Sequence, residues 1–145
     1  MKRWLPVIAW SAVILATSND WFSAAHTGSW LGVSETVNVI FRKLMHLTGY
    51  GILGVLAWSA ARQQFGTPAS SPADRETSRF PRRRDAAGPA AGTAAFLIVI
   101  LVASIDELNQ SFVPSRGGSP WDVLLDVVGA TIAIAILRVK EYRSR

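Results

Sequence analysis

Four long apolar segments constrain the fold of this chain more than any other feature. They cover residues 4–19, 44–61, 86–105 and 123–137. Each is close to the roughly 20 residues that a helix needs to cross a hydrocarbon layer of about 30 Å. We therefore predict an all-α fold, in which a single domain over residues 1–145 is an integral membrane bundle. Its four transmembrane helices are expected at about 4–19, 38–61, 87–106 and 121–138.

The basic residues predict how this bundle is oriented. All 15 Lys and Arg residues except Arg42, Lys43 and Arg116 lie in the N-terminus, the second connection or the C-terminus. Cytoplasmic segments of membrane proteins are enriched in Lys and Arg, so we predict that both termini are cytoplasmic. The net charge of +5 then reflects membrane orientation and contact with anionic lipid, and we expect no nucleic-acid partner.

The first apolar segment has a second interpretation, as a cleavable signal peptide. Basic residues precede its apolar run, and the small residues 23–25 follow it. The run lacks an A-x-A site close behind the apolar core and continues into Trp21 and Phe22, which favours a retained helix. Cleavage would leave three spans in the same orientation.

The second connection differs in composition from the rest of the chain. Residues 63–86 combine three prolines with several serines and charges of both signs. Such a segment is too polar to span a membrane and too rich in helix breakers for a firm helix. We predict a flexible cytoplasmic loop there.

Residues 104–129 place five ionisable side chains between two segments that otherwise suit a membrane. A charged side chain inside a bilayer costs about 2.5–3.5 kcal/mol on insertion scales, so such residues normally face a polar cavity. Within this segment Pro114 and two glycines break the chain, and Ser119-Pro120 restarts it with a capping hydroxyl and a proline. The last helix is therefore predicted to begin at Ser119 or Pro120.

Helical spacing places the polar residues of each segment on one face. Asp122 and Asp126 share a stripe with Gly129 and Ala133, whose small size allows close helix contact. The other stripes are Lys43, His46 and Tyr50 in the second segment, and Glu107 and Gln110 in the third. In the predicted orientation all of these residues lie at the outer ends of their spans. We expect one polar pocket that faces the extracytoplasmic side of the cell membrane.

Two motifs carry a resemblance to a known family. K-L-M-H-L-T-G-Y, which starts at Lys43, is similar to a Lys-x-x-His-x-x-x-Tyr pattern. Residues 106–130 are similar to Glu-x-x-Gln-x-Phe-x-Pro-x-Arg followed by Ser-x-x-Asp and an Asp or Asn one helical turn later. Both patterns belong to the VanZ-like family of small integral membrane proteins, which the chain resembles outside residues 63–88. One departure is Asn109, where relatives commonly carry His.

The resemblance implies a four-span membrane protein and a set of site residues. These are Lys43, His46, Glu107, Gln110, Arg116, Asp122 and Asp126. The family's namesake is associated with resistance to the glycopeptide teicoplanin, and the resemblance suggests the same link here. It implies no particular biochemical activity.

The predicted pocket suits either binding or catalysis, and the sequence leaves this choice open. The predicted ligand-binding residues are Lys43, Tyr50, Gln110, Arg116, Asp122 and Asp126, and the predicted catalytic residues are His46 and Glu107. As a binding module, Lys43 and Arg116 would hold an anionic lipid headgroup or a lipid-linked cell-wall precursor. As a hydrolase or transferase, the same cations would stabilise developing charge while His46 or Glu107 moves a proton. The chain has no cysteine, and its serines lack a G-x-S-x-G setting for a nucleophile.

Structural interpretations compete with both functions. In the first, Lys43 and Arg116 neutralise three carboxylates and the resulting ion pairs only hold the helices in contact. The carboxylates are those of Glu107, Asp122 and Asp126. Arg42 is expected to anchor its helix at the membrane interface, and Asp106 to cap a helix or extend toward the headgroups. A metal site built from His46, Glu107, Asp122 and Asp126 has suitable ligands but no HExxH-like spacing, so we expect neither metal nor cofactor.

Overall fold

The computed structural model describes residues 2–18, 32, 34–65, 89–112 and 119–143. Over these ranges the chain forms four α-helices and no strand, which confirms the predicted all-α fold. The helices are α1 (Leu5–Thr17), α3 (Glu35–Phe65), α5 (Pro89–Ser111) and α6 (Pro120–Arg143). Because α3 continues to Phe65, the first residues of the predicted loop are helical. The rest of that loop lies outside the described residues.

The start of α6 follows directly from its sequence. Pro120 is the first helical residue, where its fixed φ suits the helix and its missing N–H leaves no donor unpaired. The hydroxyl of Ser119 accepts a hydrogen bond of 3.3 Å from the backbone N–H of Trp121. The predicted helix start is therefore confirmed.

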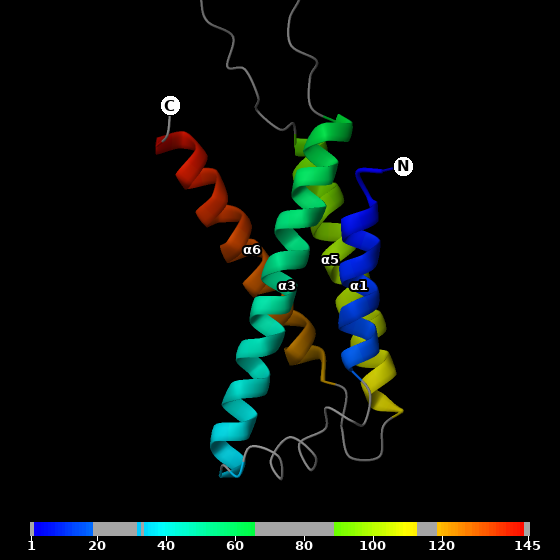
Figure 1. Cartoon of the computed structure of the whole chain (residues 1–145), viewed down its shortest axis with the longest axis vertical. Helices are drawn as coiled ribbons and strands as arrows, with labels where there is room; N and C mark the ends of the chain where they lie inside the picture. The colour runs from blue at the N-terminus through cyan, green and yellow to red at the C-terminus, as the bar shows by residue number, and fades with distance from the viewer. Residues whose placement is uncertain (1, 19–31, 33, 66–88, 113–118, 144–145) are drawn as a thin grey trace, which may run out of the picture.

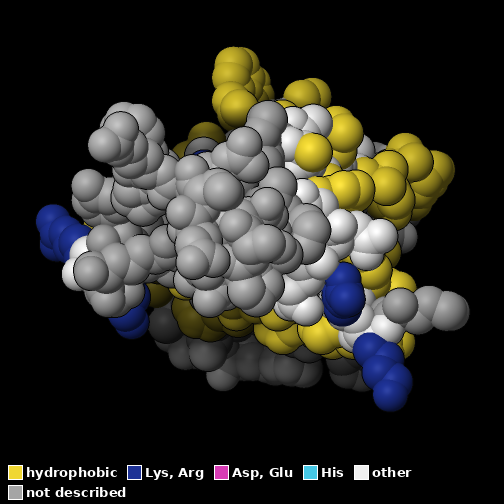
Figure 2. Space-filling view, turned by 90° about the horizontal axis from the view of Figure 1, so that it is seen from above, with side chains coloured by type: hydrophobic (Ala, Val, Ile, Leu, Met, Phe, Trp, Pro, Cys, Tyr) yellow, Lys and Arg dark blue, Asp and Glu magenta, His cyan; other side chains and the backbone are white. Residues whose placement is uncertain are grey.

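The helices alternate in direction, so each end of the bundle brings together residues from distant parts of the sequence (Figure 1). The start of α1, the end of α3, the start of α5 and the end of α6 lie at the same end. At this end Arg3 Nη1 donates a hydrogen bond of 2.6 Å to the carbonyl oxygen of Gln63, which joins the start of the chain to α3. Figure 2 shows Lys and Arg side chains at the edge of this end, and no Asp or Glu of the described residues is visible there. We call it the basic end.

Small residues let α3 and α6 approach each other closely. A Cβ added to Gly54 would lie 2.8 Å from the Cβ of Ala130, and one added to Gly129 would lie 2.8 Å from Leu47 Cδ1. Ala133 lies close to Gly51 in the same way, at 3.4 Å from the position of an added Cβ. The predicted close contact along the stripe of Gly129 and Ala133 is therefore confirmed.

The bundle exposes many large apolar side chains and buries several acids, which is unusual for a water-soluble protein. Its interior combines small apolar residues such as Ala57 and Ala103 with buried Asp106 and Asp126. Many large apolar side chains are instead exposed, among them Ile8, Leu44, Leu101, Leu108 and Ile136. Exposed apolar surface of this extent marks a face that contacts lipid or another protein.

Two helices in the described part of the chain are long and apolar enough to cross a membrane. They are Thr36–Phe65 of α3 and Ala90–Ser111 of α5. The apolar helix α1 has 13 residues, fewer than the roughly 20 that span a hydrocarbon layer, and α6 does not meet the same test. Two of the four predicted spans therefore have the length and composition that crossing a membrane requires.

Candidate functional site

A cavity of about 160 Å³ lies between α3, α5 and α6, far from the basic end. Its lining residues are Val39, Arg42, Lys43, His46, Glu107, Gln110, Asp122, Leu125 and Asp126. We call it the polar pocket. Six of these nine were predicted as site residues, so the structure brings together the polar faces of three helices.

The rim of the polar pocket carries an ion pair between two helices. Lys43 Nζ of α3 lies 2.5 Å from Asp122 Oδ1 in the first turn of α6. The Lys43 side chain is 53% exposed and that of Asp122 is 35% exposed. Water and salt weaken a pair at this level of exposure, so it contributes modestly to stability. It neutralises one carboxylate of the pocket.

Glu107 connects the end of α5 to the start of α6. Its Oε2 accepts a hydrogen bond of 2.7 Å from the backbone N–H of Ser119. The first N–H groups of a helix have no partner within the helix and carry a partial positive charge, so a carboxylate there is favourable. Glu107 therefore has a structural role in addition to the catalytic role predicted for it.

Asp106 joins buried polar side chains of α3 and α5, a role that was not predicted for it. Its side chain is fully buried, and its Oδ2 accepts hydrogen bonds of 3.1 Å from both Tyr50 Oη and Gln110 Nε2. The expectation that Asp106 caps a helix or extends toward the headgroups is wrong. One signal was available, because residues four apart in a helix share a face and Asp106 precedes Gln110 by four.

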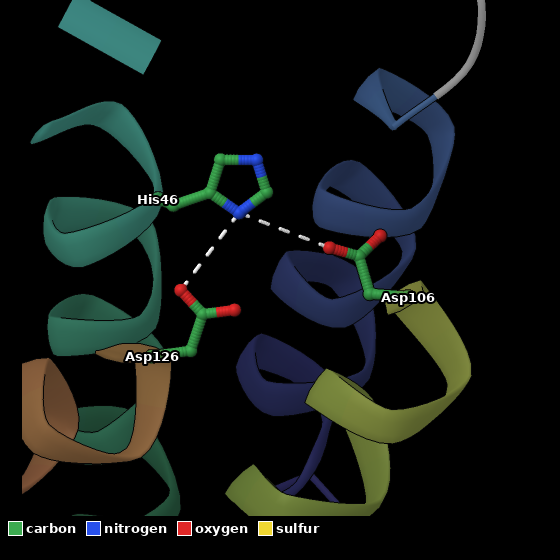
Figure 3. Close-up of side chains that lie close together, drawn as sticks. All are labelled: His46, Asp106 and Asp126. Carbon is green, nitrogen blue, oxygen red and sulfur yellow. Dashed lines mark ion pairs between the residues drawn. The ribbon is translucent and has the colours of Figure 1, made fainter. Parts of the chain in front are cut away.

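His46 lies between two buried carboxylates (Figure 3). Its Nδ1 is 3.8 Å from Asp126 Oδ1 and 4.0 Å from Asp106 Oδ2. The three side chains come from three different helices. Both carboxylate oxygens of Asp126 and Oδ1 of Asp106 have no hydrogen-bond partner among the described residues. We call these three residues the histidine–aspartate cluster.

Arg42 belongs to the wall of the polar pocket. We expected Arg42 only to anchor α3 at the membrane interface, and its place in the pocket was not predicted. Its Nε is buried and has no hydrogen-bond partner within the part of the chain that the structure describes. A buried guanidinium N–H without a partner is costly, and it suits an anionic ligand.

Arg116 was predicted to bind a ligand and lies outside the described residues, as do Gly117 and Gly118. Asn109, where the sequence departs from the family pattern, is exposed near the end of α5. The histidine–aspartate cluster lacks any contribution from this position.

Comparison with known proteins identifies one family. The family model described as VanZ/LLP1 matches residues 4–141, which is nearly the whole chain. No curated protein and no solved structure matches the chain. The family match and the two long apolar helices together indicate a membrane protein.

Proposed function

The chain belongs to the VanZ/LLP1 family, and we propose that its polar pocket binds the anionic headgroup of a cell-envelope component. The observation that carries this proposal is the buried Nε of Arg42 in the pocket wall, which has no hydrogen-bond partner among the described residues. Two of the acids in the pocket have partners of their own, because Asp122 pairs with Lys43 and Glu107 accepts the Ser119 N–H. Arg42 is thus the cation whose hydrogen bonds a ligand would complete.

The size of the pocket favours a small charged group over a whole lipid. Its volume of about 160 Å³ is below the roughly 300 Å³ at which pockets for drug-sized ligands begin. A phosphate or carboxylate fits this description, with the lipid chains outside among the exposed apolar side chains. The headgroup of an anionic lipid and that of a lipid-linked cell-wall precursor share this chemistry.

We place the polar pocket at the extracytoplasmic face of a four-span protein whose two termini are cytoplasmic. The support is the separation of charge along the bundle. Far from the pocket, Arg3 precedes α1, and the ends of α3 and α6 carry Arg62, Arg138 and Lys140. Positive charge favours the cytoplasmic side. A link to teicoplanin susceptibility is part of the same proposal and rests on the family resemblance.

A second candidate function is that of a membrane-embedded hydrolase or transferase. The histidine–aspartate cluster favours it, because an imidazole beside carboxylates serves acid–base or metal-assisted chemistry in many enzymes. Glu107 is less suited to proton transfer than predicted, since its carboxylate already accepts the Ser119 N–H.

Binding can be tested with the purified protein in nanodiscs. The probes are phosphatidylglycerol, a polyprenyl diphosphate and, as the uncharged-headgroup comparison, phosphatidylcholine, each followed by native mass spectrometry. We expect saturable binding of the anionic probes, weakened at least about tenfold in Arg42→Gln and less in Arg42→Lys, because lysine lacks the planar fork. Product masses in the same spectra would support the enzymatic candidate.

The matched control is Arg62→Gln, which removes a guanidinium from the other end of α3. Arg62 lies over the ring of Trp58 at 4.6 Å and is outside the polar pocket. The Arg62→Gln variant should bind the anionic probes as tightly as the parent does. Equal binding by Arg42→Gln and the parent would exclude the proposed role of the pocket and leave the structural lattice as the explanation.

A further inference from the structure

We propose that the histidine–aspartate cluster of His46, Asp106 and Asp126 is a binding site for a divalent first-row transition-metal ion. The three residues lie at the inner side of the polar pocket, where His46 and Asp126 belong to its lining. This site adds to the proposed function and does not depend on it, because metal binding can be measured without any headgroup ligand.

The spacing of the three side chains suits a metal ion. One ligand atom from each of the three side chains lies within 4.8 Å of the other two. Metal bonds to imidazole nitrogen and carboxylate oxygen are about 2.0–2.2 Å long, which separates ligand atoms in a tetrahedral site by roughly 3.3–3.6 Å. The observed separations of 3.8 and 4.0 Å from His46 Nδ1 are a few tenths of an ångström longer. Small side-chain rotations would close this difference.

The cluster buries two acids in the interior of the bundle. Asp106 is 0% exposed and Asp126 is 1% exposed, and three of their four carboxylate oxygens have no hydrogen-bond partner among the described residues. Burial of an ionised carboxylate costs several kcal/mol unless its charge is compensated. The single imidazole of His46, 3.8 Å from Asp126 Oδ1 and 4.0 Å from Asp106 Oδ2, carries at most one positive charge for two acids. A divalent cation would neutralise both acids and coordinate the oxygens of Asp126. This buried carboxylate points to a ligand independently of the spacing.

Two neighbouring side chains hold Asp106 in position. Tyr50 Oη and Gln110 Nε2 both donate to Asp106 Oδ2, which holds that carboxylate in one orientation. Ligating carboxylates in metal sites are commonly oriented by such outer hydrogen bonds. The mixed set of one imidazole and two carboxylates suits Zn²⁺ and Mn²⁺, whereas Mg²⁺ prefers oxygen ligands and keeps several waters.

Metal content provides the test. The parent protein, stripped with a chelator in detergent and then dialysed against micromolar Zn²⁺ or Mn²⁺, should retain about one ion per chain by elemental analysis. Asp126→Asn keeps the shape of the side chain and removes the buried charge, so we expect it to fold and to bind at least about tenfold more weakly. His46→Gln, at a partly exposed position, provides a second variant with the same expected loss.

Asp122→Asn is the control, because it removes a carboxylate of the same pocket that is paired with Lys43 and lies outside the cluster. It should retain the ion. Zn²⁺ should also raise the melting temperature of the parent and of Asp122→Asn, and leave that of Asp126→Asn unchanged. A folded parent that retains no ion, or retention of the ion by both Asp126→Asn and His46→Gln, would overturn the proposal. Failure of headgroup binding alone would contradict the proposed function and not the metal site.

Discussion

His46 Nδ1 lies 3.8 Å from Asp126 Oδ1, which joins a polar residue of α3 to a buried acid of α6. The close crossing of the two helices makes this contact. Gly129, three residues after Asp126, lies against Leu47, the residue next to His46. A larger residue at Gly129 would separate the helices at the level of the histidine–aspartate cluster. The small residues of the contact therefore belong to the structural basis of the site.

The helix crossing should be sensitive to a single methyl group. Gly54→Ala would place its Cβ 2.8 Å from the Ala130 Cβ and 3.1 Å from the Ala130 Cα, which backbone atoms cannot easily avoid. We expect the free energy of unfolding to fall by about 1–3 kcal/mol. The cost of the clash exceeds the roughly 1 kcal/mol by which alanine is favoured over glycine within a helix. Thermal unfolding in detergent measures the change. Gly49→Ala in the same helix meets no described atom within 4 Å and should be neutral or stabilising.

The hydrogen bond between Tyr50 and Asp106 should contribute to stability. Tyr50→Phe removes a donor from a fully buried carboxylate while keeping the ring, and we expect a loss of about 1–3 kcal/mol. A double-mutant cycle with Asp106→Asn isolates the contribution of the pair. Additive effects of the two changes on the free energy of unfolding would show that the contact contributes nothing.

Glu107 should stabilise the start of α6 through its charge and its position as an acceptor. Glu107→Ala leaves the Ser119 N–H without its partner, and we expect a loss of about 1.5–3 kcal/mol. Glu107→Gln keeps an acceptor without the charge and should lose less. Hydrogen exchange at the Ser119 amide provides the measurement, with faster exchange in the alanine variant. Identical exchange in the parent and both variants would contradict this role.

Orientation can be read from chemical labelling, because the chain has no cysteine of its own. Ser111→Cys lies at the end of α5 near the polar pocket, and Gln64→Cys lies at the end of α3 near the basic end. Both positions are exposed. In intact cells a membrane-impermeant maleimide should label Ser111→Cys, and should label Gln64→Cys only after the membrane is opened. The reverse pattern would place the polar pocket in the cytoplasm.

Much of the site was predictable because a helix fixes the relative directions of its own side chains. The spacing of Lys43 and His46, and that of Asp122 and Asp126, puts each pair on one face of its helix however the helices pack. Apolar segments and the Ser119-Pro120 start likewise predicted where the helices lie. These inferences depend on contacts between residues close in the chain.

The tertiary structure decided which polar residues face the interior together. The rotation of one helix against another depends on contacts between distant residues, here Gly54 with Ala130 and Gly129 with Leu47. That packing buries Asp106 beside His46 and turns Arg42 into the pocket wall. The sequence by itself determined the helices and their polar faces. Only the packing of α3 against α5 and α6 determined that three of those faces enclose one pocket, because spacing within a helix carries no information about its rotation in the bundle.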